Sequence, residues 1–221
     1  MESLKINAIY NTNETISKEL LDSKEYPWEV LSEISKYILE KGKTLNSDEY
    51  IQKSNDIWIH KTANVYPSSY IQGPCIICKD AEIRHCAFIR GNVIIGEGAV
   101  VGNSVELKNV ILFNKVQVPH YNYVGDSILG YKSHLGASSL TSNVKSDKTL
   151  VVIRKDDITI KTGIKKIGAF IGDNVEVGCG SILNPGTIIG KNSNIYPLST
   201  VRGYVPENSI YKKHDEVVGK Q

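Results

Sequence analysis

Branched aliphatic residues recur at every sixth position over two long stretches of the chain. The first run consists of Ile59, Val65, Ile71, Ile77, Ile83, Ile89, Ile95, Val101 and Leu107. The second run consists of Ile171, Val177, Leu183, Ile189, Ile195 and Val201. A helix repeats its buried face about every 3.6 residues and a strand every two, so neither explains this period. The pattern predicts a hexapeptide solenoid, in which each short strand forms one side of a coil.

The position four residues after each aliphatic is usually small. Ala81, Ala87 and Ala99 are examples in the first run, and Ser181 and Ser193 in the second. One large and one small inward position per hexapeptide suit a narrow prism, because the large side chains stack between coils and the small ones leave room at the corners.

Composition fits one globular protein domain with modest additions. The chain has 221 residues, a net charge of +2 and 41% hydrophobic residues. No apolar run approaches the roughly 20 residues that cross a bilayer, and no signal peptide opens the chain, so we expect a cytoplasmic protein. Near-neutral charge argues against nucleic acid as the main partner. The pair Cys75 and Cys78 has no second pair to complete a zinc site, so packing is its favoured role.

The periodicity divides the chain into three regions. Residues 1–55 lack it, and we expect a helical N-terminal cap over the open end of the solenoid, with helices at 27–39 and 12–21. Residues 56–206 form the solenoid, with loop insertions expected near 113–123 and 144–168, where the periodicity breaks. Residues 207–221 form a polar, basic tail. Gly42 is the only glycine before residue 56, so no nucleotidyltransferase domain with its glycine-rich loop is expected.

The candidate chemistry lies at the breaks. His120 follows a proline in the first break, and an imidazole can take a proton from an amine or hydroxyl acceptor. Tyr123 and Asn143 offer neutral hydrogen-bonding groups near it along the chain. Each residue alone also fits a structural or solvated role, so the interpretation depends on their spacing.

Three cations at corner or loop positions suit a phosphorylated ligand: Arg90, Lys108 and Lys148. Three hexapeptides make one triangular coil. The 18 residues between Arg90 and Lys108 therefore predict that these two side chains lie one above the other on the same face.

From about Arg90 to Asn143 the chain resembles the acetyltransferase half of the bacterial N-acetylglucosamine-1-phosphate uridylyltransferase/glucosamine-1-phosphate N-acetyltransferase. It is more similar still to archaeal and clostridial sugar-phosphate transferase-related proteins that share this domain. The motifs that carry the resemblance are Val101–Lys108, Val118–Ser127, Leu135–Ala137 and Leu140–Asn143, followed by Gly168–Asp173 through Pro185-Gly186. The resemblance covers about two thirds of the chain, and its most specific part is the His-x-x-Tyr-x-Gly-Asp stretch that begins at His120.

The resemblance implies an all-β, left-handed parallel β-helix that forms a homotrimer, with active sites between neighbouring subunits. It implies acetyl-CoA as the donor substrate and no metal. In this family pattern His120 is the general base and Glu106 supports it, while Tyr123 and Asn143 position the acceptor and the acetyl group. The sugar amine attacks the thioester directly, without a covalent enzyme intermediate.

The resemblance also assigns binding residues. The acceptor would contact Arg90, Lys108, Tyr123, His134 and Lys148. The acetyl-CoA contacts would be Ala137, Cys179 and Pro197, with Lys212 or Lys213 at the CoA phosphates. This chain departs from the family at His134, where an asparagine is usual, and this difference concerns the acceptor more than the donor.

Together, these features predict an acetyl-CoA-dependent N-acetyltransferase acting on an amino-sugar phosphate such as glucosamine-1-phosphate, as in UDP-N-acetylglucosamine biosynthesis. The same chemistry on another amino sugar or on a hydroxyl stays open, as does a non-catalytic trimer that serves as a scaffold or effector-binding module. A zinc hydratase of the γ-carbonic anhydrase kind needs three converging histidines. The available histidines lack that spacing: His60, His85, His120 and His134.

Overall fold

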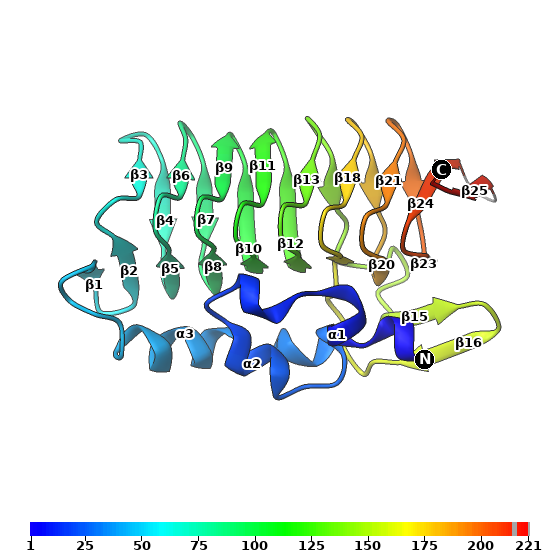
Figure 1. Ribbon diagram of the computed structural model, residues 1–221, viewed down its shortest axis with the longest axis horizontal. Coiled ribbons are helices and arrows are strands. Elements are labelled where there is room, and N and C mark those ends of the chain that lie inside the picture. The colour runs from blue at the N-terminus through cyan, green and yellow to red at the C-terminus, as the bar shows by residue number, and fades with distance from the viewer. Residues whose placement is uncertain (214–215, 221) are drawn as a thin grey trace.

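The chain winds into a triangular solenoid of parallel strands with helices along one side (Figure 1). The computed structural model describes residues 1–213 and 216–220. The solenoid is a left-handed parallel β-helix, as expected. Aliphatics of the first run from Ile77 onward and all those of the second run are at most 3% exposed, so the predicted inward positions are confirmed.

The front face of the solenoid lies toward the viewer in Figure 1. Its parallel strands are β3 (Asn64–Val65), β6 (Glu82–Ile83), β9 (Val100–Asn103), β11 (Gln117–His120), β13 (His134–Leu135), β18 (Glu176–Val177), β21 (Asn194–Ile195) and β24 (Ser209–Lys213). At its end β25 (Glu216–Gly219) pairs with β24 in antiparallel fashion.

The other two sides are here called the open face and the covered face. The open face consists of β4 (Tyr70–Gln72), β7 (Phe88–Arg90), the first halves of β10 (Glu106–Leu112) and β12 (Tyr123–Leu129), β14 (Leu140–Thr141), β19 (Ile182–Leu183) and β22 (Thr200–Val201). The covered face consists of β2 (Ile57–His60), β5 (Cys75–Ile77), β8 (Val93–Ile95), the second halves of β10 and β12, β17 (Ala169–Ile171), β20 (Thr187–Ile189) and β23 (Tyr204–Val205). At the solenoid's start β1 (Tyr50–Ser54) pairs with β2 in antiparallel fashion.

The expected loop insertion near 113–123 is not present, because the solenoid continues through these residues as β11 and the start of β12. Val101 pairs with Val118, a spacing of 17 residues instead of the 18 that separate Ile83 from Val101. The coil has lost one residue between Leu107 and the next inward position, Leu112. The six-residue pattern therefore changes phase here without a loop leaving the solenoid.

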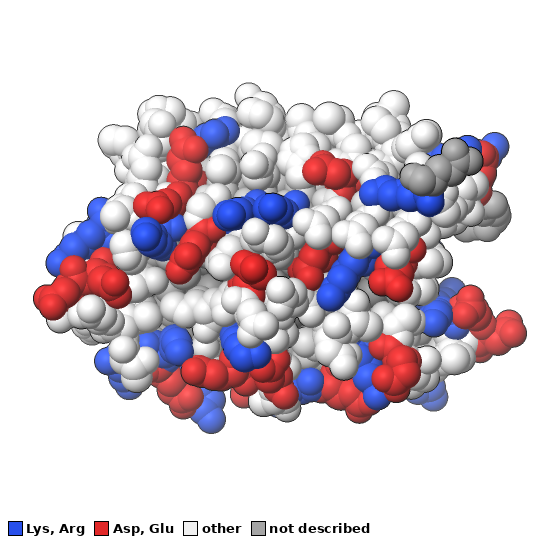
Figure 2. Space-filling model, viewed as in Figure 1, with Lys and Arg blue, Asp and Glu red and all other residues white. Residues whose placement is uncertain are grey.

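Short helices form a layer along the covered face, not a cap over the open end as the sequence led us to expect (Figure 1). They are η1 (Glu2–Leu4), α1 (Ile6–Ile9), η2 (Thr12–Glu14), α2 (Lys18–Asp22), η3 (Pro27–Val30) and α3 (Ile34–Gly42). Each expected helix is thus split into a 3-10 turn and an α-helix. Charged side chains of both signs crowd over this layer in Figure 2, as expected for its solvent side.

The location of the helical layer follows from one outward row of large apolar residues on the covered face. Its members pair in register from coil to coil: Trp58, Ile76, Ile94, Ile111, Ile128, Phe170, Ile188 and Tyr204. Burying such a row against the helices removes it from water, which is a strong driving force. Polar contacts then fix the layer, since the Tyr10 hydroxyl donates to the Ile128 carbonyl at 3.2 Å and the Asn109 amide to the Leu31 carbonyl at 3.3 Å.

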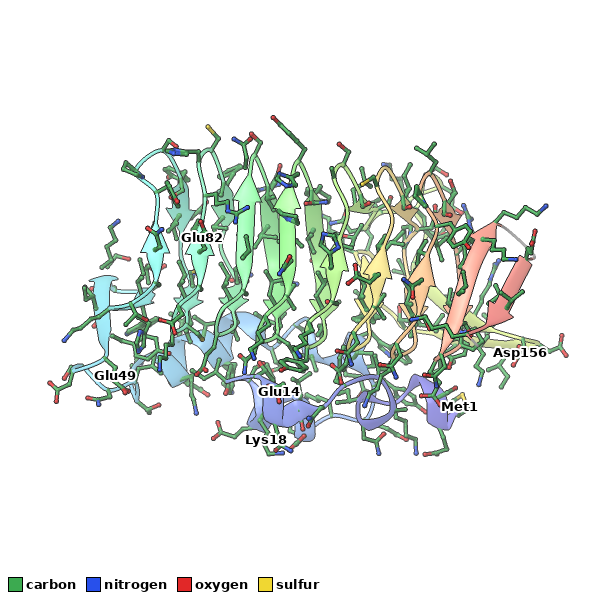
Figure 3. The ribbon with its side chains drawn as sticks, turned by 45° about the horizontal axis from the view of Figure 1, so that its top comes forward. Met1, Glu14, Lys18, Glu49, Glu82 and Asp156 are labelled. Atoms are coloured by element: carbon green, nitrogen blue, oxygen red, sulfur yellow. The ribbon has the colours of Figure 1, made fainter. Side chains whose placement is uncertain are left out.

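The segment 144–168 contains an antiparallel hairpin, β15 (Val152–Lys155) and β16 (Ile158–Lys161). Its base is packed, because Val151 and Ile153 are at most 1% exposed. Lys155 Nζ donates to Ser3 Oγ at 2.6 Å, which links the hairpin to the N-terminus. The labelled Asp156 in Figure 3 projects from the hairpin tip, away from the solenoid.

The C-terminal tail also differs from its expected form. Tyr211 pairs with Ile195, 16 residues earlier, so β24 adds a further strand to the front face. Residues 214, 215 and 221 of the expected polar tail lie outside the described residues. Within residues 1–213 and 216–220, no helix is long and apolar enough to cross a membrane.

Candidate active site

The corner between the front and open faces carries His120 and the three expected acetyl-CoA residues. In successive coils the same corner position is taken by His120, Ala137, Cys179 and Pro197. Backbone hydrogen bonds of 2.8 to 3.0 Å join each coil to the next at this corner. Adjacent coils lie about 4.8 Å apart, so this corner row spans about 14 Å. The solenoid thus aligns the expected donor contacts with the expected base.

The imidazole of His120 is open to a ligand. His120 is exposed at the end of β11, and its ring makes no hydrogen bond to any other described residue. Its backbone is held firmly, since its N–H donates to Asn122 Oδ1 at 3.1 Å. Asn122 is buried and its amide donates to the carbonyls of Gly136 and Ser139 at 2.9 Å each. The backbone of His120 is therefore fixed while its ring stays free.

A groove of about 480 Å³ runs along the front face beside this corner. Cys179, Pro197 and His134 line it. Its floor is bare backbone at Gly136 and Gly178, where a side chain would collide with the backbone of the next coil. The upper margin of the front face in Figure 2, where this corner lies, carries few charges. These features suit an extended, largely uncharged chain such as the arm of a CoA thioester.

His134, which the resemblance gave as an acceptor contact, lines this groove and lies apart from Arg90 and Lys108. It lies on β13 of the front face, and its Nδ1 is 2.7 Å from Glu176 Oε2. Lys212 and Lys213 do not line the groove; they lie in the coil after Pro197, 3.5 and 3.1 Å from the carboxylate of Glu216. These two expected CoA-phosphate contacts thus lie beyond the far end of the corner row.

Arg90 and Lys108 are neighbours on the open face, in agreement with their 18-residue spacing. β7 and β10 pair with Ile89 opposite Leu107, and the next residues of both strands are Arg90 and Lys108. Glu106 Oε1 accepts from Arg90 Nη1 at 2.6 Å and raises the pKa of that guanidinium. The structure therefore places Glu106 against Arg90 and not against His120, which it was expected to support.

Asp126 organises the residues of the open face at its corner with the covered face. It is 3% exposed, and its Oδ1 accepts from Lys108 Nζ at 2.9 Å and from Asn109 Nδ2 at 3.0 Å. Its Oδ2 accepts from Asn143 Nδ2 at 2.6 Å. One buried carboxylate thus fixes both an expected phosphate ligand and an expected acetyl-positioning residue.

Tyr123 completes this cluster on the open face. Asn143 Nδ2 donates to its hydroxyl oxygen at 3.1 Å, which leaves the hydroxyl hydrogen available to a ligand. Burial raises the pKa of Tyr123, and the charges of Asp126 and Glu106 add to this. The hydroxyl therefore stays protonated at neutral pH and can donate to a phosphate oxygen. Lys148 does not join the cluster, because it lies on the exposed loop after Asn143.

The Gly125-Asp126 pair ends the motif that begins at His120, and the sequence alone indicates no role for it. A Cβ at Gly125 would collide with the Tyr123 hydroxyl and the Asn143 amide, so glycine is required for their contact. The signal was a glycine and a carboxylate two and three residues after Tyr123. No three His, Cys, Asp or Glu side chains gather as a metal site in the described part of the chain.

Comparison with known protein families finds two matches. The GMPPB C-terminal domain matches residues 71–165. The bacterial transferase hexapeptide (six repeats) matches residues 168–203. Together these matches cover most of the solenoid and the hairpin.

Individual relatives agree with these matches. Bifunctional protein GlmU of Methanococcus maripaludis (strain C5) is 35% identical over 87% of this chain and 47% of its own length. Bifunctional sugar-1-phosphate nucleotidylyltransferase/acetyltransferase of Sulfurisphaera tokodaii is 30% identical over 84% of this chain and 47% of its length. The chain therefore spans about half the length of these relatives. Uncharacterized acetyltransferase YaiX of Escherichia coli O6:K15:H31 is 28% identical over 84% of this chain and 83% of its length.

A solved structure shares the fold. The product of the BC4754 gene of Bacillus cereus aligns with a TM-score of 0.51 over 72% of this chain and 84% of its own, at 17% sequence identity. At this identity the likeness concerns the fold alone.

Proposed function

Since this chain is a hexapeptide-repeat transferase related to the C-terminal half of GlmU-type bifunctional proteins, we propose that it acetylates the amine of an amino-sugar phosphate such as glucosamine-1-phosphate. Acetyl-CoA is the donor. The observation that carries the proposal is the alignment of His120 with Ala137, Cys179 and Pro197 beside a groove with a backbone floor. The name of the Sulfurisphaera tokodaii relative, a sugar-1-phosphate enzyme with an acetyltransferase part, supports the substrate class.

In this proposal His120 is the general base. The sugar nitrogen attacks the thioester carbon while the imidazole takes a proton from it, and the C–N bond forms. The C–S bond then breaks and CoA leaves as its thiol, taking up that proton. Backbone N–H groups near the corner stabilise the oxyanion. Arg90, Lys108 and the Tyr123 hydroxyl hold the sugar phosphate.

The active form is proposed to be a homotrimer that uses the open face. Large outward side chains on this face are exposed, with Tyr70 at 63%, Phe88 at 39% and Ile182 at 40%. Exposed apolar rows of this kind mark interaction surfaces. His120 and Lys108 lie at opposite edges of the same face, about 10 Å apart along a strand of three residues. A neighbouring subunit against the open face brings a second set of site residues near them.

The direct test is thiol release from acetyl-CoA in the presence of glucosamine-1-phosphate. We expect His120→Ala to lower turnover by about 10² to 10⁴-fold, the usual contribution of a general base. His85→Ala is the matched control, because His85 occupies the same corner one coil before Asn103 and should leave turnover unchanged. If the protein acetylates another amino sugar or a hydroxyl acceptor but not glucosamine-1-phosphate, the proposed acceptor is wrong. No CoA binding at all would leave the non-catalytic trimer.

A second test requires no turnover. Cys86 and Cys179 are the exposed thiols, whereas Cys75 and Cys78 are buried. CoA bound in the groove should slow the reaction of Cys179 with a maleimide, while Cys86, which lies on the other side of His120, should react at an unchanged rate. Equal rates at Cys179 with and without CoA would contradict the proposed groove.

A further inference from the structure

A polar cavity of about 330 Å³ lies outside the residues that the proposed reaction uses. One wall of the cavity is formed by residues 144–154 of the hairpin segment. The other wall is the corner between the open and covered faces, at residues 184–186 and 202–203. Its charged lining consists of Lys145, Arg154 and Arg202 with one carboxylate, Asp147. Cations therefore outnumber carboxylates in this cavity.

Both arginines of the cavity lack an acidic partner. The chain has four arginines. Arg84 and Arg90 pair with glutamates at 3.1 and 2.6 Å. In the described part of the chain, the Arg202 guanidinium donates only to the neutral side-chain oxygen of Asn184, at 3.3 Å, and the Arg154 guanidinium makes no hydrogen bond or ion pair. The two guanidinium groups with unused donors thus line the same cavity.

Arg154 is presented by a packed strand and not by a free loop. Val151 and Ile153 are buried against the corner at Gly186. Because successive side chains of a strand point to opposite sides, Val152 and Arg154 point the other way, and both line the cavity. The backbone that carries Arg154 is therefore fixed before a ligand binds, which lowers part of the entropy cost of binding.

The cavity is distinct from the proposed phosphate site at Lys108. On the open face the coil positions that follow Lys108 are taken by Gly125, Ser142, Asn184 and Arg202. Four coils at about 4.8 Å each separate Lys108 from Arg202 by about 19 Å. A single phosphate cannot contact both. Arg154 and Arg202 also line an adjoining hollow with Tyr204, which leaves room for an organic group beside the phosphate.

We infer that this cavity is a second binding site, for a small phosphate-bearing molecule whose phosphate is held between Arg154 and Arg202. Guanidinium groups match phosphate oxygens with paired N–H donors. The hydroxyl of Ser142 adds a further donor, whereas Lys145 is paired with Asp147 at 3.3 Å. The site does not depend on acetyl transfer, so it can be tested in the full chain without an activity assay.

The probe is inorganic pyrophosphate, titrated calorimetrically into the full-length protein. We expect Arg154→Gln and Arg202→Gln each to weaken binding roughly tenfold or more, and the double variant to lose it. Lys161→Gln is the matched control, because this exposed cation lies on the other hairpin strand and lines no part of the cavity. Unchanged melting temperatures will show that the variants are folded.

Two results overturn the inference. One is pyrophosphate binding that Arg90→Gln abolishes and Arg154→Gln leaves intact, since the anion then occupies the proposed acceptor site. The other is no detectable binding by the wild-type chain at about 10 mM pyrophosphate, since the binding free energy is then weaker than about 3 kcal/mol. Tighter binding of glucose 1-phosphate or ADP, sensitive to the same two arginine substitutions, supports the site and distinguishes a sugar phosphate from a nucleotide.

Discussion

Replacing Asp126 by asparagine tests whether one buried carboxylate organises the proposed acceptor site. The substitution keeps the shape of the side chain and removes its charge. Asp126 accepts from Lys108, Asn109 and Asn143 at 2.6 to 3.0 Å. An asparagine at 126 has one oxygen in place of two, so its own NH₂ must face one of these donors.

The expected loss of unfolding free energy depends on how deeply the two charged groups are buried. Removing one partner of a buried ion pair costs about 3–5 kcal/mol. Lys108 retains 28% side-chain exposure, whereas Asp126 retains 5%, so the ammonium can turn toward water when its partner is lost. This reduces the expected loss of unfolding free energy to about 2–3 kcal/mol. Because Lys108 is then no longer held in place, the KM for the sugar phosphate should rise roughly tenfold, equivalent to about 1.4 kcal/mol.

The assay combines urea denaturation with acceptor kinetics, and Asp173→Asn is the matched control. Asp173 is also buried, at 4% exposed, and accepts from the Asn11 and Tyr131 amides at 2.7 and 2.9 Å, far from the site. This control should lose stability and keep its KM. An Asp126→Asn protein with wild-type stability and KM would refute the reasoning, and so would an equal rise in KM for both variants.

Three further predictions concern the fold. Gly42→Ala should lower the unfolding free energy by about 1–3 kcal/mol in urea, because the new methyl collides with the Trp58 ring; no loss would show that the helix can shift freely. Phe170→Ala should cost about 3–5 kcal/mol and change the fluorescence of Trp28, whose ring lies 6.3 Å away; an unchanged spectrum would argue against this contact. Burial raises the pKa of Asp173, so the folded protein keeps this proton to higher pH than the unfolded chain and the group's stabilisation is lost as pH rises above about 4. The stability of wild type minus that of Asp173→Asn should therefore fall as pH rises above about 4, and a rise would contradict the assignment.

The inward positions were predictable because a solenoid interior depends on local periodicity alone. The same spacing predicted that Arg90 and Lys108 are neighbours. The helical layer was harder to place, yet the sequence contained its signal. Pairs of adjacent aliphatics such as Ile76-Ile77 and Ile94-Ile95 recur at intervals of about one coil, and the second member points inward while the first must be covered from outside.

Side-chain pairing was not predictable from spacing. Glu106 lies close to both His120 and Arg90 in coil position, and only the geometry of the open face shows that its carboxylate contacts Arg90. His134 was grouped with Arg90 and Lys108 as an acceptor contact by resemblance, but its strand belongs to the front face and theirs to the open face. Which of three faces a side chain occupies depends on the phase of the repeat, and a single missing residue changes that phase.

Successive inward residues are usually six positions apart, one for each side of a coil. All exceptions from Ile77 onward fall at the corner between the open and covered faces. From Ile77 onward, the steps that cross the other two corners keep six residues. At this corner the step from Leu107 to Leu112 is five residues, and that from Val201 to Val205 is four. The hairpin segment is inserted here as well.

This distribution has a physical reason. The groove beside His120 has a backbone floor at Gly136 and Gly178, and this floor depends on the unbroken register of the front face. The corner opposite the front face carries no such constraint and can lose or gain residues. Where it is shortened, Asn109 and Asp126 make the turn with positive φ angles of 56° and 49°, and they hydrogen-bond to each other. The carboxylate that closes this turn also holds Lys108 and Asn143, so coil closure and the geometry of the proposed acceptor site depend on the same atoms and should be lost together in Asp126→Asn.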